Sequence, residues 1–172
     1  MKELLQCIRC WGNVHEQVIK RIVNACFTKE EKQMIYIIRH GRTEMNKAMV
    51  LQGRSDIKMN DEGIAQAKKA ADLLKKVKFA HVFSSPLIRA RQTAQLIAKD
   101  ADIIVDERLI EMDYGPYEGV LLDQLPPEIE TFFRDFVHNP APQGMEPLSS
   151  VEKRMGDFLE ELRGRNEPIL IS

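Results

Sequence analysis

Two arginines flank a histidine directly after a short apolar run, in the stretch Arg39-His40-Gly41-Arg42. The run before it, residues 34–38, is rich in isoleucine and contains a tyrosine, which is typical of a short buried strand. The charged cluster is therefore expected at the carboxyl end of a strand, where open α/β sheets bind their ligands. The neighbouring positive charges disfavour protonation of His40 and attract an anion. A neutral imidazole beside guanidinium groups can attack a phosphoryl group while its oxygens are held.

Three later stretches carry residues that could complete an anion site. Residues 52–55 (Gln-Gly-Arg-Ser) predict a glycine-containing loop whose backbone N–H groups can approach a ligand. Ser85-Pro86 predicts a helix start directly after a strand, with Arg89 early in that helix, and such a start can bind an anion. Glu111 lies in a long acidic and aromatic loop, which in a compact domain more often serves a site than only connects elements.

The elements that must position these residues follow from the hydrophobic periodicity. Strands are predicted at 34–38, 81–84, 103–105 and 168–172, the first and the last of them buried. Helices are predicted at 60–77, 86–99, 125–137 and 149–163. Asn60 is the expected N-cap of the first helix, and Ser149 with Glu152 forms an expected capping box at the last. Strands that alternate with helices favour an α/β fold, a three-layer α/β/α sandwich with a mostly parallel sheet.

Residues 1–33 are predicted to be an N-terminal amphipathic helical extension, and residues 34–172 a single domain. Over residues 2–27, apolar side chains share one helical face and polar side chains the other. The favoured interpretation is packing on the main domain or on a second copy, so a homodimer is a candidate state; membrane-surface docking is the weaker alternative. Cys7 and Cys10 form a CxxC pair that chance explains better than a zinc site, because no second CxxC follows.

Composition excludes several classes of partner. The net charge of −1 provides no overall field that favours nucleic acid or a membrane. No apolar run approaches the length of a transmembrane helix. The three cysteines cannot all pair within the chain, which favours a reduced, cytoplasmic protein.

The stretch Arg39–Asn46 resembles the RHGxTxxN signature of the histidine phosphatase superfamily, which includes the cofactor-dependent phosphoglycerate mutases. The resemblance continues in the family's order through residues 51–53, the helix start at 60–63, the segment 84–94 and the loop 111–119. It therefore covers residues 34–172. The match is specific to the superfamily and does not identify a substrate.

The resemblance implies a role for each candidate residue. His40 would be the nucleophile that forms a phosphohistidine, while Arg39 and Arg89 would clamp the phosphoryl oxygens. Glu111 would protonate the departing alcohol and later activate water. Further substrate contacts are implied for Asn46, Gln52 and Gly53, and Arg42 is a weaker candidate for one. The family chemistry requires neither a metal nor an organic cofactor.

The carboxyl end of the sequence bears on the expected activity. In this family a second histidine follows the strand that resembles residues 168–172, and the sequence ends at Ser172. We expect catalysis to fall by roughly two or more orders of magnitude if these residues are the whole protein, and ordinary activity if they are a fragment.

The favoured function is hydrolysis of a small phosphorylated metabolite through a phosphohistidine. The stretch from Gly119 to Ser149 is shorter than the insertion by which the mutases that this chain resembles retain their intermediate. Phosphoglycerate mutase is the alternative enzyme. A non-catalytic phosphate-binding or interaction protein is the alternative from another class.

Overall fold

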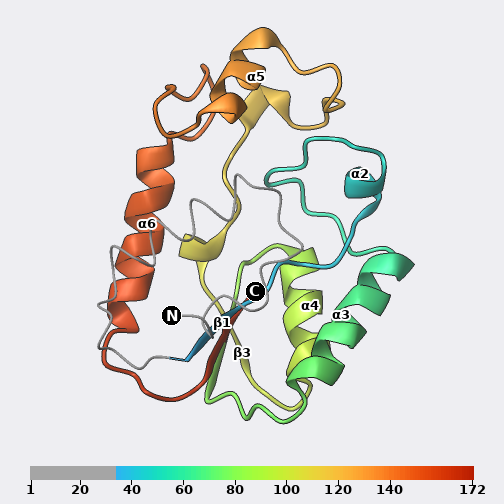
Figure 1. Ribbon diagram of the computed structural model, residues 1–172, viewed down its shortest axis with the longest axis vertical. Coiled ribbons are helices and arrows are strands. Elements are labelled where there is room, and N and C mark those ends of the chain that lie inside the picture. The colour runs from blue at the N-terminus through green and yellow to red at the C-terminus, as the bar shows by residue number, and fades with distance from the viewer. Residues whose placement is uncertain (1–33) are drawn as a thin grey trace.

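A parallel sheet forms the middle of the domain in the computed structural model, which describes residues 34–172 (Figure 1). The helix and the CxxC pair predicted within residues 1–33 lie outside the described residues. Four strands in the described part form the sheet in the order β1-β4-β2-β3: β1 (Ile35–Ile37), β2 (His81–Ser84), β3 (Ile103–Val105) and β4 (Ile169–Ile171). All pairings are parallel, so the predicted strands and the predicted parallel sheet are confirmed.

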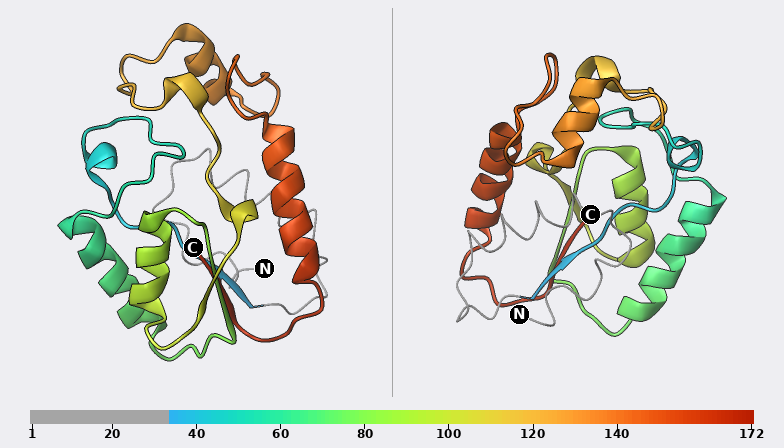
Figure 2. Two further views of the ribbon diagram at one scale, coloured as in Figure 1. Left: turned by 180° about the vertical axis from the view of Figure 1, so that it is seen from behind. Right: turned by 45° about the horizontal axis from the view of Figure 1, so that its top comes forward.

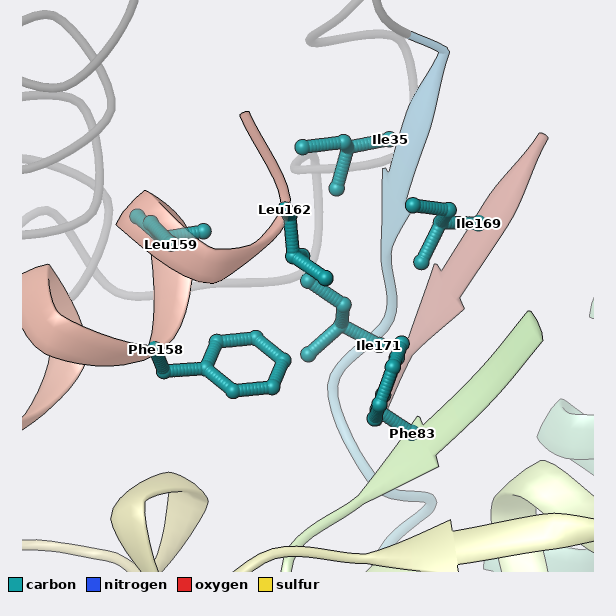
Figure 3. Packing of buried hydrophobic residues seen from close by; sticks show 7 residues of the cluster. All are labelled: Ile35, Phe83, Phe158, Leu159, Leu162, Ile169 and Ile171. Carbon is teal, nitrogen blue, oxygen red and sulfur yellow. The ribbon is translucent and has the colours of Figure 1, made fainter. Parts of the chain in front are cut away.

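Helices lie on both faces of this sheet. Figure 2 shows α3 (Asp61–Leu74) and α4 (Ile88–Ile97) on one side and α6 (Leu148–Glu161) on the other. The residues of β4 alternate accordingly: Leu170 joins the cluster on the α4 side, whereas Ile169 and Ile171 pack toward α6. Figure 3 shows the cluster on the α6 side: Ile35, Phe83, Phe158, Leu159, Leu162, Ile169 and Ile171. Such burial on both faces explains why β1 and β4 lie in continuous apolar runs, whereas Ile104 and Val105 of the edge strand β3 are exposed.

Two of the predicted helix starts differ from the observed ones. Asn60 does cap α3, since its side-chain oxygen accepts from the Gly63 N–H at 2.9 Å. The helix predicted from Pro86 begins at Ile88, where the Asp56 carboxylate accepts from the Ile88 N–H at 2.6 Å and takes the capping role expected of a serine. The capping box predicted at the start of α6 is wrong, because the helix already begins at Leu148 and has no side-chain cap.

A separate apolar cluster lies off the carboxyl end of the sheet. Residues 110–147, which we call the cap, contain the 3₁₀ helix η3 (Gly115–Tyr117) and α5 (Pro127–Arg134). Figure 1 shows α5 standing beyond the end of the sheet. Ile129, Phe132 and Phe136 of the cap are buried in this cluster, which Leu51 and the first turn of α6 complete. None of the helices within residues 34–172 is long and apolar enough to cross a membrane.

Candidate active site

The carboxyl ends of the parallel strands bring four predicted residues to one cavity of about 190 Å³. Arg39 and His40 follow β1, Arg89 lies in α4 after β2, and Glu111 follows β3 beyond the 3₁₀ helix η2 (Glu107–Leu109). Parallel strands end at the same edge of a sheet, so residues far apart in sequence converge there. We call Arg39, His40 and Arg89 the basic floor of the cavity.

His40 is held as a neutral imidazole. Its Nδ1 lies 2.8 Å from the Gly41 carbonyl oxygen, which places the ring proton on Nδ1 and leaves the lone pair on Nε2. Burial lowers the pKa of His40 to about 4, and the charges of Arg89 and Arg39 act in the same direction, against the Gly41 hydrogen bond and Glu111. The sequence predicted that the arginines would disfavour protonation of His40. In the structure, burial lowers the pKa of His40 more than the arginines do.

The glycine after the histidine fixes the loop against two helices. The Gly41 N–H donates to the Thr93 hydroxyl at 3.1 Å, and that hydroxyl donates to the Arg89 carbonyl at 2.8 Å. A Cβ at Gly41 would overlap the Gly63 carbonyl oxygen at the start of α3. Only a residue without a side chain allows this approach. No local sequence pattern indicates the role of Thr93, which the fold brings to the loop from α4.

Arg89 is only 2% exposed and is held by the loop at residues 52–55. Its Nη1 donates to the Ser55 carbonyl at 2.8 Å, and its Nη2 donates to the Gly53 carbonyl at 2.6 Å. The Gln52 side-chain amide satisfies its oxygen and its nitrogen together in one of its two orientations. In that orientation, the amide oxygen of Gln52 accepts from Arg89 Nη1 at 2.7 Å, and the amide nitrogen of Gln52 donates to the Thr43 hydroxyl at 2.7 Å. Burial lowers the pKa of Arg89, but a guanidinium stays protonated in proteins.

The backbone N–H groups of this loop have a partner inside the chain. Arg54 and Ser55 donate their N–H groups to the Glu118 carboxylate at 2.7 and 2.9 Å. Gly53 has a φ of +52°, and a Cβ there would overlap the Glu118 carboxylate. From its sequence, this loop was expected to offer its N–H groups to a ligand. In the structure, the N–H groups of residues 54 and 55 bind Glu118, while its carbonyls orient Arg89.

Two further predicted contacts lie outside the cavity wall. Asn46 forms a capping box with Thr43 at the start of the short helix α2 (Glu44–Lys47), its side-chain oxygen accepting from the Thr43 N–H at 3.1 Å. Arg42 binds both carboxylate oxygens of Glu62 at 3.0 Å on the surface of α3. Gln52 and Gly53 also stay behind the floor, so their contact with a substrate remains a prediction.

Glu111 is positioned by its own loop and by Arg54. One oxygen of its carboxylate accepts from the Met112 N–H at 2.8 Å. Arg54 donates its Nε to the Glu111 carbonyl at 3.1 Å and also contacts Asp113 at 3.3 Å and Glu146 at 3.1 Å. Burial acts to raise the pKa of Glu146, but the hydrogen bond and charge of Arg154 and the charge of Arg54 lower it below its ordinary value. Arg54 therefore ties the loop at residues 52–55, which holds Arg89, to the segment of the cap that carries Glu111.

The cap and α6 supply a wall that sequence reasoning did not assign to the site. We call six of its side chains the apolar wall: Tyr114, Phe132, Phe133, Phe136, Val151 and Met155. Tyr114 is 5% exposed, and its hydroxyl forms no hydrogen bond within residues 34–172. Burial raises the pKa of Tyr114 well above its ordinary value, with the Glu111 charge adding to the effect. The aromatic content of the loop after Glu111 was the only sequence signal for this wall.

The other histidines of the described residues lie away from the cavity. His81 accepts from Arg165 at 3.1 Å, and His138 pairs with Asp135 at 2.8 Å on the surface. Within residues 34–172, no group of three His, Cys, Asp or Glu side chains is placed to hold a metal ion.

Comparison with known proteins identifies the family. Residues 35–171 match the model of the histidine phosphatase superfamily, branch 1. The chain is 37% identical over 147 residues to a probable phosphoglycerate mutase GpmB of Serratia proteamaculans, a match that covers 80% of this chain and 68% of that protein. It is 41% identical over 133 residues to the fructose-2,6-bisphosphatase TIGAR of Xenopus tropicalis, covering 73% of this chain and 48% of that one.

A solved structure agrees with these relatives. The fold superposes on a variant phosphoserine phosphatase of Entamoeba histolytica, crystallised with phosphoserine, with a TM-score of 0.70 and 32% identity. That similarity covers 80% of this chain and 71% of the other. The names of the three proteins indicate three different substrates. What the three have in common is the fold and chemistry on phosphate esters. The chain belongs to branch 1 of the histidine phosphatase superfamily, a family of phosphatases and mutases.

Proposed function

We propose that the protein hydrolyses a small phosphomonoester through a phosphohistidine at His40. One observation carries the proposal: a half-buried, neutral imidazole with its proton on Nδ1 shares a cavity with Arg39, Arg89 and Glu111. This arrangement supplies a nucleophile, fixed positive charge and a carboxyl group in one place.

In the first step, the Nε2 lone pair of His40 attacks phosphorus and the bond from phosphorus to the ester oxygen breaks. Arg39 and Arg89 stabilise the charge that spreads over the phosphoryl oxygens. Because carbonyls of residues 53 and 55 hold the Arg89 guanidinium, it need not reorganise during the reaction. Glu111 gives a proton to the departing alcohol oxygen.

In the second step, the Glu111 carboxylate takes a proton from water, and that water attacks the phosphorus of the phosphohistidine. The N–P bond breaks, inorganic phosphate leaves, and His40 regains its Nε2 lone pair. The same carboxyl group therefore serves first as acid and then as base, as microscopic reversibility favours for two opposite proton transfers.

Trapping the intermediate tests this proposal. We expect p-nitrophenyl phosphate to release p-nitrophenol and phosphate, and rapid quenching at alkaline pH to leave a phosphoryl group on the peptide that contains His40, detected by mass spectrometry. His40→Ala should abolish both, whereas the matched control His138→Ala, at an exposed position outside the cavity wall, should keep both. Turnover that survives in His40→Ala would contradict the proposal.

The names of several relatives favour phosphoglycerate mutase as a second candidate. Incubation with 3-phosphoglycerate separates the two, because a mutase forms 2-phosphoglycerate whereas a hydrolase releases phosphate and glycerate. Binding of vanadate without turnover of any ester would instead support a phosphate-binding protein without catalysis.

A further inference from the structure

The cavity combines its basic floor with a wall of a different character. The six residues of the apolar wall come from the cap and from α6, and they present aromatic rings and aliphatic chains to the space beside His40. The Tyr114 and Phe133 rings meet edge to face, with centroids 5.7 Å apart. Whatever is attached to a phosphoryl group on the floor would extend along this wall.

The cations around the cavity are already committed. Arg154 also lines it, but its Nε and Nη2 donate to Glu146 at 3.0 and 3.2 Å, and its Nη1 donates to the Arg108 carbonyl at 2.7 Å. The remaining basic side chains of the described wall are Arg39 and Arg89, which the proposed function assigns to the phosphoryl group. A second anionic group on the substrate would therefore lose its hydration without gaining a cation.

The size of the cavity limits what the wall can hold. Its volume is about 190 Å³, and an apolar cavity of about 150 Å³ is known to hold benzene. Aromatic side chains also favour offset or edge-to-face contact with another ring. One ring next to the phosphoryl group satisfies both conditions, whereas a hydroxyl-rich sugar would place most of its polar groups against hydrocarbon, because Tyr114 supplies the one hydroxyl among the six wall residues.

We propose that the substrate is a phosphomonoester whose alcohol carries one aromatic or similarly sized apolar group and no second anionic group. This inference rests on the proposed function and names the substrate class of the same site. It sets the chain apart from enzymes that act on phosphoglycerates or bisphosphorylated sugars. The apolar wall then acts as the specificity-determining surface.

A panel of three esters that all leave as primary alcohols tests the proposal. We expect kcat/KM for benzyl phosphate to exceed that for glycerol 3-phosphate by roughly 10- to 100-fold, and that for 3-phosphoglycerate by more. Phe133→Ala should reduce the benzyl preference to a few-fold, whereas Val137→Ala, an exposed apolar position of the same cap outside the wall, should leave it unchanged. Equal or better use of glycerol 3-phosphate or 3-phosphoglycerate by the unaltered chain would overturn it.

A gain-of-function variant addresses charge directly. Val151→Lys places an ammonium in the wall and should raise kcat/KM for 3-phosphoglycerate relative to benzyl phosphate by about tenfold or more. Ser149→Lys, at an exposed position of the same helix, is the matched control and should not change the ratio. An unchanged ratio in a folded Val151→Lys protein counts against the proposal.

Binding separates this inference from the proposed function. The Kd of benzylphosphonate, which cannot be hydrolysed, should be at least about tenfold lower than that of 3-phosphonopropionate, by calorimetry on the full chain. Tighter binding of benzylphosphonate without turnover of any ester would support the substrate class and contradict hydrolysis. Turnover of esters without preference for benzyl phosphate, together with equal Kd values, would support hydrolysis and contradict the substrate class.

Discussion

The two sides of the cavity are stabilised by different interactions. On the basic floor, Arg89 and the loop at residues 52–55 are fixed by short hydrogen bonds between buried polar groups. On the apolar wall, side chains of the cap and of α6 are held by packing alone, such as the Phe132 ring of α5 and the Phe136 ring of the turn that follows it. Hydrogen bonds demand particular partners, whereas apolar packing tolerates exchange of one side chain for another of similar volume.

This difference separates chemistry from selectivity. A change on the floor leaves a buried donor or acceptor without a partner, so it should affect every substrate and also the stability of the fold. A change on the wall alters the shape and polarity of the space beside the phosphoryl group, so it should alter the choice among substrates. The predictions below test this separation.

Arg89→Ala should produce the largest effect, because it affects both catalysis and folding. We expect kcat/KM to fall by about 10²- to 10³-fold for every ester alike, since a fixed positive charge is lost from the transition state. The free energy of unfolding should fall by about 1–3 kcal/mol, because the buried carbonyls of residues 53 and 55 lose their donor. Steady-state kinetics and urea unfolding measure the two effects.

Arg91→Ala is the control for this prediction, since Arg91 is an exposed arginine of the same helix that does not line the cavity. It should keep both activity and stability. A loss in Arg89→Ala that differs strongly between benzyl phosphate and glycerol 3-phosphate would contradict the separation of floor from wall.

The pH dependence of stability isolates the burial of His40 on the floor. Its pKa of about 4 in the folded chain lies below the ordinary value of 6.5, so the unfolded chain takes up a proton first as the pH falls. The unaltered chain should therefore lose up to about 3 kcal/mol of stability relative to His40→Asn between pH 7 and pH 4, and no further difference should develop below pH 4.

Urea unfolding of both proteins at several pH values checks this. The His40 ring signal in NMR, assigned by its absence from His40→Asn, provides a second measurement of the pKa. Parallel stability curves for the two proteins would show that the ring is not buried in its neutral form.

The floor could largely be predicted from sequence, because its chemistry lies in short segments next to strands. Arg39 and His40 directly follow the apolar run of β1, and Arg89 follows β2 by a few residues, so a parallel sheet suffices to bring them together. The partner of the loop N–H groups could not be predicted in the same way. Glu118 is more than sixty positions away from Arg54 and Ser55, and no local pattern indicates their contact.

The wall was missed for a related reason. The aromatic side chains of residues 125–137 form a helical stripe, which predicts only the apolar face of one helix, and the observed helix α5 ends at Arg134, before Phe136. Phe132, Phe133 and Phe136 also line the cavity because the cap stands over the end of the sheet, a placement set by tertiary packing. The start of α4 shows the same limit, since the carboxylate that caps it comes from Asp56 in another loop.

Arg54 gives the smallest predicted effect and the sharpest test, because it joins the two sides. It belongs to the loop that holds Arg89 on the floor, and its guanidinium binds three residues of the cap: the Glu111 carbonyl and the carboxylates of Asp113 and Glu146. We expect Arg54→Ala to lower kcat for benzyl phosphate by roughly tenfold with a smaller change in KM, because it displaces the group that protonates the alcohol. The loss should be smaller with p-nitrophenyl phosphate, whose leaving group needs little protonation, and Arg54→Lys should restore part of it.

Lys58→Ala, an exposed cation in the same segment, is the control and should behave as the unaltered chain. Equal losses with the two esters would show that Arg54 supports the fold without positioning Glu111, and the two sides of the cavity would then be coupled by stability alone.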